Sequence, residues 1–160
     1  MSQQRLNAMQ QAPELFKKYV EFSMAVKKAG IDETTANLVA IRTAQLNGCG
    51  FCLDMHIKQA SIQGERPLRL HHVAIWRESP LFSNRERAAL EWTDALTRLG
   101  EAGVDDDVYA SVRSQFGEKE ITELSWVVLL NNGWNRLNVG FRTKPGSADK
   151  AFGLDKAALA

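Results

Sequence analysis

Apolar residues recur at the three- to four-residue spacing of amphipathic helices along most of the chain. Capping and breaking residues mark where these helices would begin and end. Asp32 can cap the start of one helix and Gly48 can end it, while Ser83 and Glu86 form a capping-box pattern at the start of another. The pattern predicts helices over residues 13–30, 32–47, 49–64, 67–76, 83–100, 105–116 and 118–141.

One apolar stretch, residues 126–130, has the local propensity of a strand. No second strand-like run exists to pair with it, so we assign it to the last long helix. The sequence therefore predicts an all-α bundle of about six to seven helices. We expect residues 1–160 to form a single domain with a core at about 13–142. Residues 143–160 should form a surface tail that is long enough for one short helix.

The composition excludes several classes of function. A chain of 160 residues with 44% hydrophobic side chains can bury a core of its own without disulfides or a structural metal. Its 20 basic and 19 acidic residues leave a net charge of +1, which argues against binding to nucleic acid. No apolar run approaches the roughly 20 residues of a membrane span, and residues 1–12 lack the apolar region of a secretory signal. We therefore expect a cytoplasmic protein that binds neither nucleic acid nor a membrane.

The two cysteines, Cys49 and Cys52, fall within four residues and are followed by His56. A pair this close cannot staple distant parts of a fold, so in a chain without an export signal it indicates redox or metal chemistry. If a helix begins at Cys49, the three side chains share one face. The helix N-terminus stabilises a thiolate, and His56, one turn from Cys52, can accept or relay its proton. We interpret the three residues as a redox-active dithiol with an acid–base partner.

Three other interpretations of the cysteines are weaker. A structural zinc site needs four ligands, and His71 or His72 would have to supply the fourth at a spacing that no familiar zinc motif uses. Inert packing of two buried cysteines leaves His56 unexplained. A thioredoxin fold places its CxxC after a strand, and no strand is predicted before Cys49.

Residues 37–56, NLVAIRTAQLNGCGFCLDMH, resemble the core signature of the AhpD-like alkylhydroperoxidases in the carboxymuconolactone decarboxylase superfamily. Two further segments, WRESPLFS at 76–83 and WNRL at 134–137, are similar to segments of the same group, so the likeness spans about residues 13–142. The resemblance implies an all-helical subunit in a homo-oligomer, commonly a trimer or hexamer. It also implies a peroxidase that reduces hydrogen peroxide or alkyl hydroperoxides without a metal, haem or flavin cofactor.

The same resemblance implies a role for each residue of the motif. Cys52 attacks the peroxide and becomes a sulfenic acid, Cys49 condenses with it to a disulfide, and His56 is the proton partner. A thioredoxin-like or lipoyl-type dithiol then restores both thiols. Helix geometry by itself leaves open which sulfur attacks, because Cys49 is nearer the helix terminus and Cys52 is nearer His56.

The sequence departs from the family pattern at two positions. The family's proton relay usually includes a Glu twelve residues before the first cysteine, where this chain has Asn37. An amide cannot take a proton at neutral pH, and Glu33, one turn earlier on the same face, is the candidate replacement. Phe51 stands where some members carry a His between the cysteines. These departures keep a second function open, a dithiol sensor or disulfide exchange protein with little peroxidase turnover. The superfamily name suggests a third, a lactone decarboxylase that needs no dithiol.

Overall fold

The computed structural model describes residues 3–157. All the secondary-structure elements named in this range are helices. Seven elements match the predicted helices in order: α2 (Pro13–Lys27), α3 (Glu33–Asn47), α4 (Gly50–Ile62), α5 (Pro67–His72), α6 (Asn84–Thr97), α7 (Asp106–Arg113) and α8 (Glu118–Phe141). The short elements are α1 (Ala8–Gln11), α9 (Asp149–Phe152) and the 3-10 helices η1 (Val73–Ile75) and η2 (Leu154–Lys156). The all-α prediction is confirmed, and residues 126–130 lie inside α8. None of the described helices is long and apolar enough to cross a membrane.

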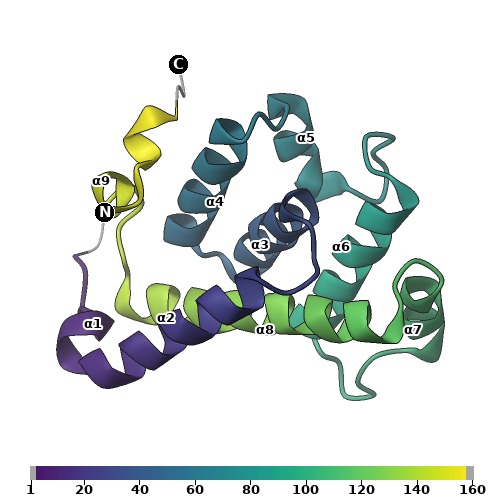
Figure 1. Cartoon of the computed structure of the whole chain (residues 1–160), viewed down its shortest axis with the longest axis horizontal. Helices are drawn as coiled ribbons and strands as arrows, with labels where there is room; N and C mark the ends of the chain where they lie inside the picture. Colours follow the sequence, from purple (N-terminus) through teal and green to yellow (C-terminus); the bar gives the residue numbers. More distant parts are fainter. Residues whose placement is uncertain (1–2, 158–160) are drawn as a thin grey trace.

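Helix α3 lies at the centre of the molecule, between α4, α6 and α8 (Figure 1). It meets a different group of helices on each side. Val39 packs among side chains of α2, α6, α7 and α8, whereas Leu38 and Ile41 pack among side chains of α4, α5 and α6. Ala44, near the end of the helix, packs against the two cysteines. Because α3 is buried on several sides, it holds α4 and its cysteines against the rest of the core.

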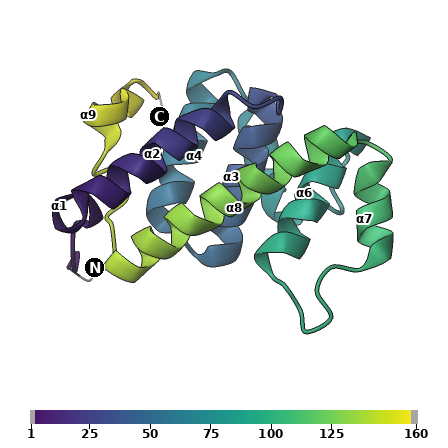
Figure 2. The ribbon, with the colours of Figure 1, turned by 60° about the horizontal axis from the view of Figure 1, so that its bottom comes forward.

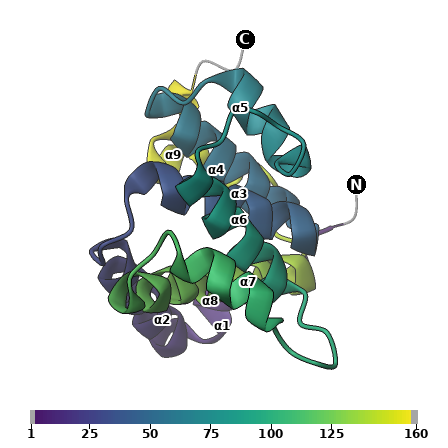
Figure 3. The same cartoon turned by 90° about the vertical axis from the view of Figure 1, so that its right-hand side faces the viewer.

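The helices form two layers. Helices α2 and α8 run side by side in one layer (Figure 2), and α3, α4 and α5 lie in the other (Figure 3). The Tyr19 hydroxyl donates to the Leu130 carbonyl oxygen at 2.8 Å, which ties α2 to α8. Gly133 permits this approach, because a Cβ at that position would overlap the Tyr19 hydroxyl. A side chain at Gly133 would therefore displace the Tyr19 ring and its hydrogen bond to α8.

The turn between α3 and α4 sets where the cysteine helix begins. Asp32 caps α3 as predicted, and its carboxylate accepts from the Thr35 N–H at 2.9 Å. Gly48 ends α3 in the left-handed backbone conformation, with φ of 65°, which residues with a Cβ rarely adopt. Helix α4 then begins directly after Cys49, its N-cap, and packs along α3. Both cysteines are therefore placed at the helix start, where the first backbone N–H groups have no carbonyl partner within the helix.

The predicted surface tail is in fact packed against α4. Leu154 of η2 is 3% exposed, and η2 contacts α4. Lys58 on α4 forms ion pairs with Asp54 and Asp149, each at 2.7 Å, so the tail is joined to the cysteine helix by a charge cluster. The Gly146 N–H adds a hydrogen bond of 3.0 Å to Asp54. The sequence did not predict this docking because a short segment with several charges, whose apolar residues are mostly alanine, is also typical of a solvated end.

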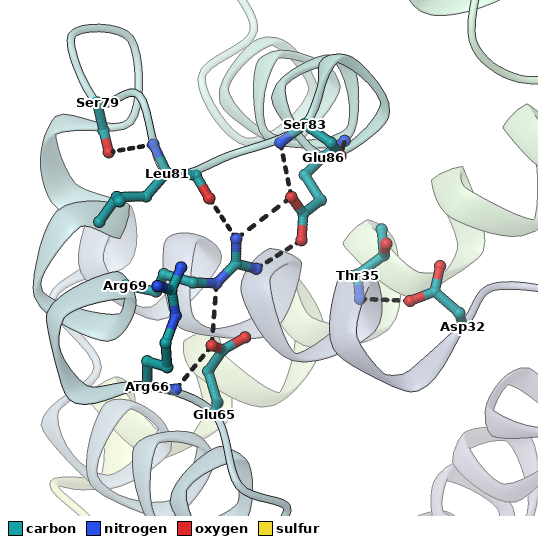
Figure 4. A network of polar contacts seen from close by, with 9 residues as sticks. All are labelled: Asp32, Thr35, Glu65, Arg66, Arg69, Ser79, Leu81, Ser83 and Glu86. Carbon is teal, nitrogen blue, oxygen red and sulfur yellow. Dashed lines mark hydrogen bonds and ion pairs between the residues drawn. The ribbon is translucent and has the colours of Figure 1, made fainter.

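A buried arginine joins the end of α4, helix α5 and the start of α6 (Figure 4). The Arg69 guanidinium donates to Glu65 at 2.9 Å, to Glu86 in the first turn of α6, and to the Leu81 carbonyl oxygen in the loop between α5 and α6. Glu86 also accepts from the Ser83 N–H at 2.8 Å, which completes the predicted capping box. The network therefore fixes the loop that precedes α6.

Candidate functional site

The two cysteines lie at the N-terminus of α4 and are joined by a disulfide. Cys49 is the N-cap residue, and its sulfur accepts a hydrogen bond from the Cys52 N–H at 3.3 Å. The two Cα atoms are 5.4 Å apart, a separation within the range that disulfides span. The pair can therefore close within one turn of helix, and the backbone N–H groups of that turn favour negative charge on sulfur.

Both sulfur atoms are shielded from solvent. Cys49 is 2% exposed and Cys52 is 1% exposed, and both pack with Ala44 of α3. The segment that follows α8 covers the start of α4, because Pro145 lies 3.5 Å from the position that a Cβ on Gly50 would occupy. An oxidant therefore reaches either sulfur only when the side chains around it or the C-terminal segment move.

A row of asparagines on α8 faces the cysteine helix. Asn131, Asn135 and Asn138 follow one another at spacings of four and three residues, so they share one face of α8. Asn138 donates to the Cys52 sulfur at 3.7 Å. Asn135 is fully buried and accepts from the Asn47 amide at 3.1 Å, which joins α8 to the end of α3. This row was not predicted, although amides at helical spacing within a largely apolar helix indicate a polar contact inside the core.

His56 lies one turn after Cys52 on α4, and helical side chains lean back toward the N-terminus, the end that carries the sulfurs. Its Nδ1 atom is 2.9 Å from the Gln59 side-chain oxygen. With the hydrogen on Nδ1, the Nε2 atom is the unprotonated nitrogen of the neutral ring. Burial lowers the pKa of His56 to about 4. Hydrogen bonds to Gln59 and Asn131 raise the pKa, but their effect is smaller than that of burial. At neutral pH the ring is therefore uncharged.

The buried neutral imidazole of His56 predicts a loss of stability in acid. Its pKa is about 4 in the folded protein and about 6.5 in an unfolded chain, so between these values the unfolded state binds the additional proton. We expect this group to lower the free energy of unfolding by about 2 kcal/mol between about pH 7 and about pH 5. His56→Gln should lack that part of the fall. Urea unfolding of wild type and His56→Gln at pH 7 and pH 5 measures this difference. An identical pH dependence of the free energy of unfolding in the two proteins would contradict the assignment to His56.

Glu33 and Asn37 lie at the other end of the α3–α4 pair. The Asn37 amide donates to the Gln63 side-chain oxygen, and the Gln63 amide donates to Glu33 at 2.5 Å. Glu33 also pairs with Lys27 at 3.8 Å. A cavity of about 140 Å³ lies here, between Asn37 and Ala60. The structure joins Cys49 to Cys52 and carries His56 one turn further along α4. Within residues 3–157 neither Glu33 nor Asn37 forms a hydrogen bond or ion pair with these residues, and the catalytic roles of all five stay predictions.

The zinc interpretation of the cysteines receives no support. In the part of the chain that the structure describes, no three His, Cys, Asp or Glu side chains gather closely enough to hold a metal ion. The His72 ring nitrogen lies 3.0 Å from the Ser79 hydroxyl, and His71 is exposed. Neither histidine completes a tetrahedral set with the cysteines.

The sequence model of the carboxymuconolactone decarboxylase family matches residues 13–95, which include both cysteines and His56. The chain belongs to this family. Over 144 residues this family member is 33% identical to the uncharacterized protein YdfG of Bacillus subtilis (strain 168), which covers 90% of this chain and 98% of YdfG. Over 112 residues it is 34% identical to the uncharacterized protein YnjA of Escherichia coli (strain K12), which covers 70% of this chain and 61% of YnjA.

Solved structures place this family member among AhpD-like proteins. The crystal structure of ATU0492 from Agrobacterium tumefaciens superposes with a TM-score of 0.87 at 34% identity, over 89% of this chain and 98% of ATU0492. ATU0492 is a protein of unknown function that has been suggested to be the antioxidant defence protein AhpD. The apo structure of the debrominase Bmp8 gives a TM-score of 0.78 at 18% identity, over 92% of this chain and 78% of Bmp8, and so shares the fold. The AhpD-like resemblance is confirmed.

Proposed function

We propose that this family member is a thiol-dependent peroxidase that reduces alkyl hydroperoxides or hydrogen peroxide. The observation that carries the proposal is the Cys49–Cys52 disulfide at the start of α4, with a neutral His56 one turn away. A pair that closes within one turn can alternate between dithiol and disulfide without unfolding of the helix. The suggested antioxidant role of ATU0492 points in the same direction.

In the proposed cycle the Cys52 thiolate attacks one peroxide oxygen. The S–O bond forms while the O–O bond breaks, and the alcohol leaves after it takes up a proton. The Cys49 thiol then attacks the sulfenic sulfur, which forms the disulfide and releases water. An external dithiol reduces the disulfide and becomes a disulfide itself. The sum is ROOH + R′(SH)2 → ROH + H2O + R′S2, in which His56 takes the thiol proton and returns it to the leaving oxygen.

The proposal includes two kinds of partner. A thioredoxin-like or lipoyl-type dithiol suits the regeneration step, because both reduce disulfides by thiol–disulfide exchange. A second copy of the chain suits the apolar surface of α8, where Trp126 and Leu129 are 49% and 52% exposed. We propose a homo-oligomer of three or six subunits in which these side chains become buried.

Peroxide consumption tests the proposed function. Reduced protein mixed with hydrogen peroxide or an organic hydroperoxide should consume one equivalent alone and many equivalents when a dithiol reductant is present. Without reductant, mass spectrometry should show the loss of two hydrogens as the disulfide between Cys49 and Cys52 forms. A protein that forms the disulfide but consumes no further peroxide with any dithiol would contradict the peroxidase proposal.

The second candidate function is a dithiol sensor or disulfide exchange protein with little turnover. It is favoured by Asn37, an amide at the position where the family relay usually carries a carboxylate. Reversible disulfide formation without sustained peroxide consumption is the outcome that identifies it. A lactone decarboxylase, the third candidate, would keep its activity in both Cys49→Ser and Cys52→Ser, because that chemistry needs no dithiol.

Asn37→Glu is expected to raise the peroxidase rate by about tenfold, because it restores a carboxylate that can exchange protons. The cavity between Asn37 and Ala60 gives the longer side chain room, and Ala60 is one turn from His56. Asn37→Gln adds the same length without the charge, so it should leave the rate unchanged. Steady-state rates over a range of pH compare the three proteins. Equal rates in the Glu and Gln variants would show that a carboxylate at this position does not limit turnover.

A further inference from the structure

Helix α8 brings one side chain into contact with the sulfur that the proposed cycle treats as the nucleophile. We propose that Asn138 is a catalytic residue, whose amide N–H donates to the Cys52 thiolate and lowers the pKa of that thiol. The inference deepens the proposed function and rests on it, because Asn138 is catalytic only if Cys52 is the nucleophile. The hydrogen bond itself and its effect on the thiol can be measured without peroxide.

The orientation of the Asn138 amide follows from its two contacts. Its nitrogen lies 2.9 Å from the Trp134 carbonyl oxygen and 3.7 Å from the Cys52 sulfur. A carbonyl oxygen only accepts hydrogen bonds, so the NH2 end of the amide must face it. An NH2 group carries two hydrogens, and the second is available to the sulfur. The contact with Trp134, one turn earlier on α8, therefore holds the donor in place.

Reduction of the disulfide strengthens this contact. A disulfide sulfur is a weak acceptor, whereas a thiolate carries a full negative charge, and hydrogen bonds to charged acceptors are shorter and stronger than those to neutral ones. Cys52 is 1% exposed, so water contributes little to the solvation of its charge. A protein donor at this sulfur therefore stabilises the reactive form more than it stabilises the disulfide.

The Asn138 donor acts on one sulfur of the pair. The Cys49 sulfur accepts from the Cys52 backbone N–H at 3.3 Å, a donor that any residue at position 52 except proline would supply. His56 lies one turn after Cys52 on α4, and its Nδ1 atom is engaged with Gln59 at 2.9 Å. Removal of the Asn138 amide should therefore change the acidity of Cys52 and leave that of Cys49 nearly unaltered.

Thiol titration in two single-cysteine proteins tests the proposal. The ultraviolet absorption of the thiolate is followed against pH in Cys49→Ser, which keeps Cys52, and in Cys52→Ser, which keeps Cys49. Adding Asn138→Leu should raise the Cys52 pKa by about one unit, since a hydrogen bond to a charged group is lost. Asn138→Asp should raise it further, because a carboxylate repels the thiolate. Neither change should move the Cys49 pKa. Asn138→Ala replaces the Leu variant if circular dichroism shows that the latter has lost its helices.

Two results would overturn the proposal: an unchanged Cys52 pKa in folded Asn138→Leu, or an equal change in both single-cysteine proteins, which would indicate a general electrostatic effect. Failure of the proposed function gives a different pattern. If the Cys52 pKa shifts as expected but the wild type consumes no peroxide beyond one equivalent, the peroxidase proposal fails and the hydrogen bond stands. If turnover is normal and the Cys52 pKa does not shift, only the role of Asn138 fails.

Discussion

Cys52→Ser is expected to abolish peroxide turnover, with a loss of at least about a thousandfold in the presence of a dithiol reductant. A serine hydroxyl is protonated at neutral pH and forms no counterpart of a sulfenic acid, so both the attack and the disulfide are lost. Serine is close to cysteine in volume and should fit a site that is 1% exposed. Helix content and the unfolding midpoint therefore serve as checks that the loss is chemical.

Cys49→Ser is the matched control, because it removes the other sulfur from the same turn. We expect this protein to consume one equivalent of peroxide and then to hold a sulfenic acid on Cys52, since no neighbouring thiol can condense with it. A sulfenic-acid-selective nucleophile and mass spectrometry would detect the adduct. If Cys52→Ser forms the adduct on Cys49 instead, the assigned roles are reversed. If both variants retain full turnover, the dithiol is not the reactive group.

The positions of the helices along the chain were predictable because their signals are local. Asp32 and the pair Ser83 and Glu86 satisfy backbone N–H groups within their own first turns, and Gly48 adopts a conformation that few other residues tolerate. The docking of the tail was not predictable in the same way. It depends on Lys58 and Asp149, which are 91 residues apart and carry no pattern that pairs them.

The same distinction separates the parts of the site. Cys49, Cys52 and His56 could be proposed from spacing because one helix carries all three. Asn138 reaches Cys52 from a helix 86 residues further along the chain, and only the packing of α8 against α4 brings the two side chains together. Asn37 is the opposite case. The family resemblance suggested a relay at its position, twelve residues before Cys49, but its side-chain hydrogen bond goes to Gln63.

Arg69→Met is expected to lower the free energy of unfolding by about 3–5 kcal/mol, the range for removing one member of a buried ion network. The methionine keeps the apolar stem, but Glu86 and the Leu81 carbonyl oxygen lose their donor in an environment where Arg69 is only 9% exposed. Lys18→Met is the exposed control. Its ion pair with Glu21 joins side chains that are 75% and 48% exposed, so the change should be below about 0.5 kcal/mol. Urea unfolding compares both variants with the wild type.

The pH dependence of the Arg69→Met effect separates a lost ion pair from lost packing. Burial alone would raise the pKa of Glu86, but hydrogen bonds from Arg69 and Ser83 outweigh it and hold the pKa below its usual value. Without Arg69 the pKa of Glu86 should rise relative to the wild type, because the largest contribution that lowers it is lost while the burial stays. Ionisation of Glu86 therefore stabilises the wild type more than the variant, and this advantage disappears as the carboxyl is protonated at lower pH. The stability difference between wild type and variant should therefore shrink between about pH 7 and about pH 4. A difference that stays constant over this range would mean that Arg69 acts through packing alone.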